Sequence, residues 1–235
     1  MCKEITGNRE YKDNIFRLLF GEESKSAELY NAIKGTNYAP NLLKMNTIQN
    51  PFFFGTLRND VSFTIEDRLI VLFEHNSSIN PNMGLRFLLY IALLYEFLID
   101  KKAMYKKKKM SIPSPEFYMI YNGKEKYPEK MIVKLSDLFK VQDSGENNLE
   151  LIVAVINVNK GYNKPILERS KTLDEYAEFV AKVRDYTDNS GLELTEALKR
   201  AVEDCVRENI LHDFLVKYGG DIVNILYREW NLEDA

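Results

Sequence analysis

Residues 60–76 read DVSFTIEDRLIVLFEHN, and this stretch decides how the rest of the chain is interpreted. It holds two runs rich in β-branched and aromatic residues, Val61–Ile65 and Leu69–His75, separated by the polar segment Glu66-Asp67-Arg68. Such runs favour strands, and a short polar segment between two of them is typical of a hairpin. The sequence therefore predicts an antiparallel pair of strands with a turn near Asp67.

An acidic residue stands at each side of the open end of this hairpin. Asp60 begins the first strand, and Glu74 lies near the end of the second. Antiparallel pairing places the start of one strand beside the end of the next, so we expect the two carboxylates to be neighbours. Side chains alternate along a strand, so Glu74 and Asn76 share one face, while His75 points away and offers its backbone carbonyl.

Two converging carboxylates suit a hard divalent cation, and such a cation is what phosphodiester hydrolysis uses to activate water. The pattern therefore suggests Asp60, Glu74 and the carbonyl of His75 as ligands of a divalent cation, with Asn76 beside them. Other interpretations stay open at this point. An acid at a strand end is also common as a turn or cap partner, Asn76 also fits a loop, and His75 also fits packing.

Helical and strand patterns surround the hairpin. Two short helices, Asp13–Phe20 and Ser26–Ile33, precede it, and the second stops at Gly35. A helix from Asn82 to Ile99 follows Asn80-Pro81, and we expect its stripe Leu85, Leu88, Leu89, Ala92, Tyr95 and Leu98 to face the core. The later elements are strands at Glu116–Tyr121 and Leu149–Val158 and helices at Pro165–Tyr186 and Leu194–Tyr218. The prediction is an α/β domain, a mixed sheet flanked by helices with a helical C-terminal part.

Several strings of the chain resemble, in order, the Rpn family of recombination-promoting nucleases, also called PD-(D/E)XK nuclease family transposases. They are Lys12-Asp13 with Phe16–Phe20, Asn59–Phe63, Leu69–Met83, Tyr121-Asn122-Gly123, Asn157–Gly161 and Tyr176–Phe179. The resemblance covers residues 11 to about 218. It implies a restriction-endonuclease-like fold, magnesium-dependent endonuclease cleavage of DNA, and a role in recombination, horizontal gene transfer or phage defence.

The resemblance also implies which residues act. Asp60 and Glu74 match the two metal-binding acids of the family, and Asp13 matches the first-helix acid that some members of the superfamily add; a helix-start carboxylate is the alternative for Asp13. One departure is Asn76, because the family usually has glutamine where the superfamily has lysine, and asparagine is shorter and uncharged. Residues 1–160 would form the nuclease core, and residues 161–235 a helical part packed on it.

Candidate DNA contacts are basic residues close to the acids and a run of six lysines between Lys101 and Lys109. We expect Arg17, Arg58 and Arg86, together with Lys106 and Lys107, to contact phosphates; the alternative for each is a solvated side chain. The net charge of −3 argues against a protein that coats nucleic acid through non-specific binding, but an enzyme needs only a local basic groove.

Composition limits the remaining possibilities. With 45% hydrophobic and 29% charged residues, the chain is typical of a globular protein. Because it has neither a membrane-length apolar run nor an apolar leader, we expect no membrane association and a cytoplasmic location, with Cys2 and Cys205 as free thiols. Two further hypotheses are a homodimer formed through the C-terminal helices and a catalytically weakened regulator that binds DNA or a full-length paralogue.

Overall fold

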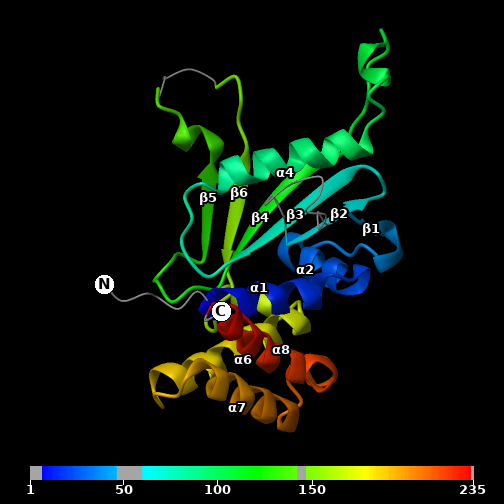
Figure 1. Cartoon of the computed structure of the whole chain (residues 1–235). Helices are drawn as coiled ribbons and strands as arrows, with labels where there is room; N and C mark the ends of the chain where they lie inside the picture. The colour runs from blue at the N-terminus through cyan, green and yellow to red at the C-terminus, as the bar shows by residue number, and fades with distance from the viewer. Residues whose placement is uncertain (1–6, 47–59, 142–146, 234–235) are drawn as a thin grey trace. The chain divides into compact units, whose positions relative to one another are not determined.

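The computed structural model describes residues 7–46, 60–141 and 147–233 and has a mixed α/β architecture (Figure 1). Its contacts divide the chain into a sheet unit, Asn37–Asn157, and a helical unit made of Met1–Thr36 and Val158–Ala235. The sequence had suggested a core of residues 1–160 and a helical part of residues 161–235. The division by contacts differs from this in grouping the first 36 residues with the C-terminal helices.

The sheet unit contains six strands among the described residues, in the order β1-β2-β3-β4-β6-β5. The neighbours β1/β2, β2/β3 and β5/β6 are antiparallel, whereas β3/β4 and β4/β6 are parallel. The strands are β1 (Leu43–Met45), β2 (Val61–Ile65), β3 (Leu69–Asn76), β4 (Ser114–Tyr121), β5 (Lys130–Lys134) and β6 (Ile152–Asn157). Three short 3₁₀ turns accompany them: η1 (Pro40–Leu42), η2 (Ala103–Tyr105) and η3 (Leu135–Leu138).

The predicted hairpin is confirmed in position and register. Ile65 pairs with Leu69, and the amide of Arg68 donates to the carbonyl of Ile65 at 2.9 Å. Glu66 and Asp67 have φ angles of 49° and 53°. Two positive φ angles in the middle of a tight turn define the type I′ geometry, whose twist matches that of paired strands.

Helix α4 (Met83–Leu98) connects the parallel strands β3 and β4 and lies across one face of the sheet (Figure 1). Its buried residues pack with Ile70, Leu72 and Met119 in one hydrophobic cluster. Gly84 permits a close approach, because a Cβ there would lie 2.9 Å from the Cα of Leu135. The buried face of α4 consists of Met83, Gly84, Phe87, Tyr90, Ile91 and Leu94.

The predicted core stripe of α4 is therefore wrong for several of its members. Leu85, Leu89 and Leu98 are 47%, 43% and 38% exposed, and Ala92 is also exposed. The helix is apolar around most of its circumference, so its periodicity does not identify the face that packs on the sheet. Strands β1 and β5 were not predicted, because one has three residues and the other begins and ends with lysine.

The helical unit consists of α1 (Gly7–Phe20), α2 (Glu23–Lys34), α5 (Lys164–Leu167), α6 (Lys171–Asp188), α7 (Leu194–Arg207) and α8 (His212–Glu233). Gly35 ends α2 with a φ of 71°, as expected for a C-terminal glycine. The two long helices predicted after residue 164 are each divided. Ser170 caps α6 by accepting a hydrogen bond from the amide of Leu173, and Asn209 and Leu211 adopt positive φ between α7 and α8.

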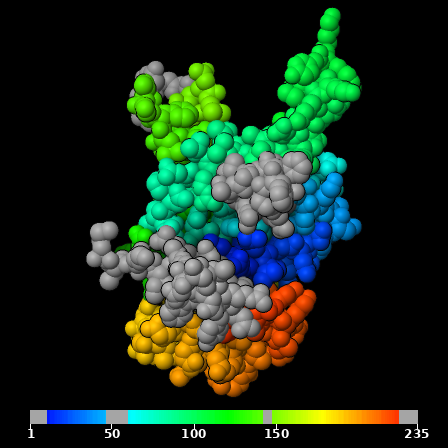
Figure 2. Space-filling view, viewed as in Figure 1, coloured from blue at the N-terminus to red at the C-terminus, as the bar shows by residue number. Residues whose placement is uncertain are grey.

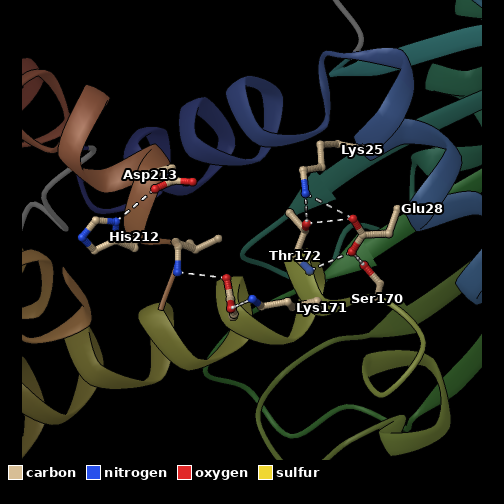
Figure 3. Close-up of polar contacts among 9 residues, drawn as sticks. Lys25, Glu28, Ser170, Lys171, Thr172, His212 and Asp213 are labelled. Carbon is tan, nitrogen blue, oxygen red and sulfur yellow. Dashed lines mark hydrogen bonds and ion pairs between the residues drawn. The ribbon is translucent and has the colours of Figure 1, made fainter. Parts of the chain in front are cut away.

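A carboxylate on α2 binds the start of α6 (Figure 3). Glu28 accepts hydrogen bonds from the Ser170 hydroxyl at 2.8 Å, from the Thr172 amide at 2.8 Å and from the Thr172 hydroxyl at 2.9 Å. Lys25 donates to the Thr172 hydroxyl at 2.8 Å. Burial by itself would raise the pKa of Glu28, but these hydrogen bonds hold it below its ordinary value. The carboxylate therefore fixes α2 to α6 in its charged form.

The apolar stripe of α7 is buried within the helical unit itself. Leu198, Ala201 and Cys205 have no exposed surface, and Cys205 is a free thiol as predicted; Cys2 lies outside the described residues. The apolar stripe of α7, one of those behind the hypothesis of a dimer through the C-terminal helices, is thus covered within the chain itself. No helix among the described residues combines the length and apolarity needed to cross a membrane.

Candidate active site

The candidate site lies at the open end of the β2–β3 hairpin. The outermost pair of the ladder is Val61 with Phe73, so Asp60 and Glu74 are the next residues outward on the two strands. Asp60 Oδ2 accepts a hydrogen bond from the backbone amide of His75 at 2.7 Å. The side chain of Asp60 thus extends the ladder by one bond and is fixed beside the end of β3.

Glu74 is a buried carboxylate on the face of the sheet that α4 covers. Ile70 and Leu72 belong to the cluster under α4, and alternation along β3 places Glu74 on the same face. Its side chain is 3% exposed and pairs with Arg86, with 2.7 Å between Oε2 and Nη2. A buried carboxylate is costly without a compensating charge, so this ion pair accounts for an ionised Glu74.

Tyr90, one turn after Arg86 on α4, completes the network. Its hydroxyl accepts hydrogen bonds from Nε of Arg86 at 3.3 Å and from Nη2 at 2.9 Å. Burial and the nearby Glu74 carboxylate raise the pKa of Tyr90 to about 12, and Asp60 contributes in the same direction. Burial would lower the pKa of Arg86, but Glu74 and Tyr90 keep it above its ordinary value. Both acids of the hairpin therefore act electrostatically on one Arg–Tyr pair.

Asn76 and His75 take the opposite sides that alternation along the strand predicts. Asn76 donates from Nδ2 to the sulfur of Met83 at 3.2 Å, within hydrogen-bond distance for sulfur. His75 is 2% exposed, and its backbone amide is the donor to Asp60. Because the imidazole of His75 is buried on the other face of the sheet, it is placed for packing. The group of His75 that could serve the site is its backbone carbonyl oxygen.

The donor set fits a magnesium ion. Two carboxylates and a backbone carbonyl are hard oxygen ligands, and Mg²⁺ is commonly bound through one or two carboxylates plus water. Among the described residues, no group of three or more His, Cys, Asp or Glu side chains is arranged to hold a metal ion. Two carboxylates and one backbone carbonyl are fewer than the four ligands of a structural zinc site.

The other predicted site residues fall in different parts of the chain. Asp13 and Arg17 are half-buried residues of α1 in the helical unit, whereas Asp60, Glu74 and Arg86 belong to the sheet unit. Arg58 lies outside the described residues. Of the predicted arginines, Arg86 is the one that the structure brings into contact with a predicted acid.

The lysine run forms a projecting arm between α4 and β4, seen at the upper right of Figures 1 and 2. All six lysines are exposed, including Lys106 and Lys107, and so is Tyr105, at 89%. Lys101 pairs with Glu96 at 2.6 Å. Asp100 precedes Lys101 and Lys102, whereas the stretch that carries Lys106–Lys109, residues 101–115, contains no acidic residue.

Neither Tyr90 nor Met83 was singled out from the sequence as a contributor to the site. The signal was the spacing on α4: Met83, Arg86 and Tyr90 are separated by three and four residues. That spacing places the three side chains on one face of the helix. The same face lies over Glu74 and Asn76, which their contacts with Arg86 and Met83 confirm.

Comparisons of this chain with protein-family models, with curated proteins and with solved structures gave no match.

Proposed function

We propose that the protein is a divalent-cation-dependent DNA endonuclease of the Rpn type, with Asp60 and Glu74 as its metal ligands. The observation that supports this most directly is the pair of acids at the open end of one hairpin, close to a common Arg–Tyr pair. A fixed aspartate and a buried glutamate beside a half-exposed arginine give both a site for a cation and a contact for a phosphate.

The residues would divide the work of phosphodiester hydrolysis. In this reaction a water oxygen bonds to phosphorus, one phosphorus–oxygen ester bond breaks, and a proton from water ends on the leaving oxygen. Bound Mg²⁺ or Mn²⁺ would supply the acidity that activates water and the charge that stabilises the leaving oxygen. Asp60, Glu74 and the carbonyl of His75 would hold the cation, while the side-chain oxygen of Asn76, whose Nδ2 donates to Met83, would orient water by accepting from it.

The projecting arm supports DNA as the substrate. Lys106 and Lys107 are exposed and lie in a stretch of the sequence, residues 101–115, without acidic residues, which suits contacts to a phosphate backbone. We also propose the restriction-endonuclease-like fold for the sheet unit and a cytoplasmic role in recombination or phage defence, both of which rest on the resemblance of the sequence. Asp13, Arg17 and Arg58 are part of this proposal as additional site residues.

Incubation of plasmid DNA with the pure protein tests the proposal. We expect nicking or linearisation in Mg²⁺ or Mn²⁺ that stops when a chelator is added. The Asp60→Asn protein should lose this activity, whereas Asp213→Asn, a change in an exposed acid of α8, should keep it. No cation-dependent cleavage by wild type in either metal would contradict the proposal.

A second candidate function is a regulator that keeps the architecture and binds DNA or a paralogue without cutting. The observation in its favour is that both acids already have protein partners, Arg86 for Glu74 and the His75 amide for Asp60. Asn76 also supplies no charge. Calorimetry with Mn²⁺ separates the two candidates, because a regulator of this kind need not bind the cation. Light scattering of the same sample determines whether a homodimer forms.

A further inference from the structure

The position of Arg86 between a buried acid and the protein surface suggests a specific role. Its side chain is 36% exposed, whereas that of Glu74 is 3% exposed, and 2.7 Å separates Nη2 from Oε2. Arg86 is therefore the partner of this ion pair that solvent and a ligand can reach.

The guanidinium is held in one orientation, and one of its nitrogens keeps donor capacity. Nε and Nη2 donate to the hydroxyl of Tyr90, and Nη2 also contacts Glu74. Among the described residues, the partner recorded for Nη1 is the sulfur of Met83 at 3.7 Å, a weak acceptor. Nη1 carries two N–H groups, so at least one of them is available to an oxygen of a ligand.

The charges of the site explain what that donor would bind. Two carboxylates neutralise a divalent cation, so a loaded site without Arg86 would offer no net attraction to a phosphodiester anion. Asn76 adds no charge, and its amide is directed to Met83. Arg86 leaves one positive charge at the site, and Tyr90 fixes the guanidinium at close range. A planar guanidinium is well suited to recognise phosphate oxygens.

We propose that Arg86 supplies the positive charge that Asn76 lacks: Nη1 binds a non-bridging oxygen of the scissile phosphate while Nη2 orients Glu74. This role rests on the proposed nuclease function. Arg86 is then a catalytic residue, because it touches the reacting phosphate, and Tyr90 is a positioning residue that acts through it. The same contact opposes binding of the cation, because Arg86 places a positive charge against a metal ligand.

Two opposite effects of one substitution test this role. In Arg86→Gln, Mn²⁺ affinity measured by calorimetry should rise about tenfold, since a positive charge beside Glu74 is gone, while cleavage of DNA falls about a hundredfold. The metal-free variant should also melt at a lower temperature than wild type, and Mn²⁺ should raise its melting temperature more than it raises that of wild type. Arg200→Gln, which breaks the surface pair of Arg200 with Glu196 on α7, is the matched control and should change none of these values.

Rescue and conservative variants separate this role from a structural one. Asn76→Lys added to Arg86→Gln should restore cleavage at least about tenfold, because it returns a cation to the site. Tyr90→Phe keeps the charge of Arg86 but removes the hydroxyl that holds the guanidinium in place. The cleavage rate at saturating DNA should therefore fall by a larger factor than the KM for DNA changes. If Arg86→Gln does not fold, Arg86→Lys carries the test, with partial cleavage expected.

The outcomes distinguish the two proposals. If Arg86→Gln or Arg86→Lys cleaves DNA at the wild-type rate and binds Mn²⁺ with wild-type affinity, the role proposed for Arg86 is wrong, and the nuclease proposal stands. A wild-type protein that neither binds Mn²⁺ nor cuts DNA would overturn both.

Discussion

Replacement of Glu74 by Gln should separate the chemistry of the site from its stability. The side chain is 3% exposed and accepts a hydrogen bond from Arg86 at 2.7 Å. A hydrogen bond to a charged group contributes about 1.5–3 kcal/mol and one to a neutral amide oxygen about 0.5–1.5 kcal/mol, so about 1 kcal/mol is lost. The variant no longer buries a carboxylate, which offsets that loss. Its free energy of unfolding without metal should therefore stay within about 1 kcal/mol of wild type.

Cleavage should respond far more strongly than stability. Loss of a charged metal ligand should weaken Mn²⁺ binding and reduce cleavage at least about a hundredfold, equivalent to about 2.7 kcal/mol of transition-state stabilisation. DNA binding in a gel-shift assay should persist, because the lysines of the arm are unchanged. The matched control is Glu96→Gln, which alters an acid of α4 that is 57% exposed. Cleavage by Glu74→Gln at the rate of a metal-dependent wild type would refute the assignment of the site.

Three further changes probe other parts of the molecule. Glu28→Gln should lower the free energy of unfolding by about 1–3 kcal/mol at neutral pH. Because hydrogen bonds lower the pKa of Glu28 in the folded state, the difference between variant and wild type should be complete above the ordinary carboxyl pKa of 4.5 and should disappear as the pH falls below it. Urea unfolding at several pH values measures this, and a difference that does not change with pH would contradict it. Replacement of Lys106 and Lys107 by Glu should weaken DNA binding and reduce the dependence of DNA affinity on salt concentration by about two released ions, with an unchanged melting temperature. Equal DNA affinity at low and high salt would argue against the arm as a DNA contact. Gly84→Ala should destabilise by about 1–3 kcal/mol, because the new Cβ would meet the Leu135 backbone at 2.9 Å, and a thermal melt at or above that of wild type would contradict this.

The hairpin could be predicted from the sequence because several local signals agree. Strand-forming runs flank a polar turn, and the turn residues Glu66 and Asp67 adopt the geometry that a hairpin requires. The relation of Asp60 to Glu74 then follows from pairing alone, since register is fixed once the turn is fixed. Period-two alternation likewise placed Glu74 and Asn76 on one face without any tertiary information.

Features that depend on packing could not be predicted in the same way. Helix α4 carries apolar residues on most of its sides, and tertiary contacts decided that Phe87 and not Leu89 is buried. The contact of Arg86 with Glu74 joins a helix to a strand. The periodic pattern of either element predicts which residues share a face of that element, but it does not predict which residue of another element they contact. The break between α7 and α8 depends on positive φ at Asn209 and Leu211, and leucine gives no local signal for that conformation.

The division into units has a consequence for synthesis of the chain. The sheet unit is one continuous stretch, residues 37–157, and it interrupts the helical unit, whose two parts are residues 1–36 and 158–235. On the ribosome the sheet unit can fold as soon as its last strand has emerged. The helices of residues 7–34 are made before it, and they wait on the order of ten seconds for α6 and α8, the later helices of their unit that they contact. During that interval Phe16, which packs on Phe20, is without the ring of Tyr176, so exposure to aggregation or to chaperones should be greatest for the helices of residues 7–34.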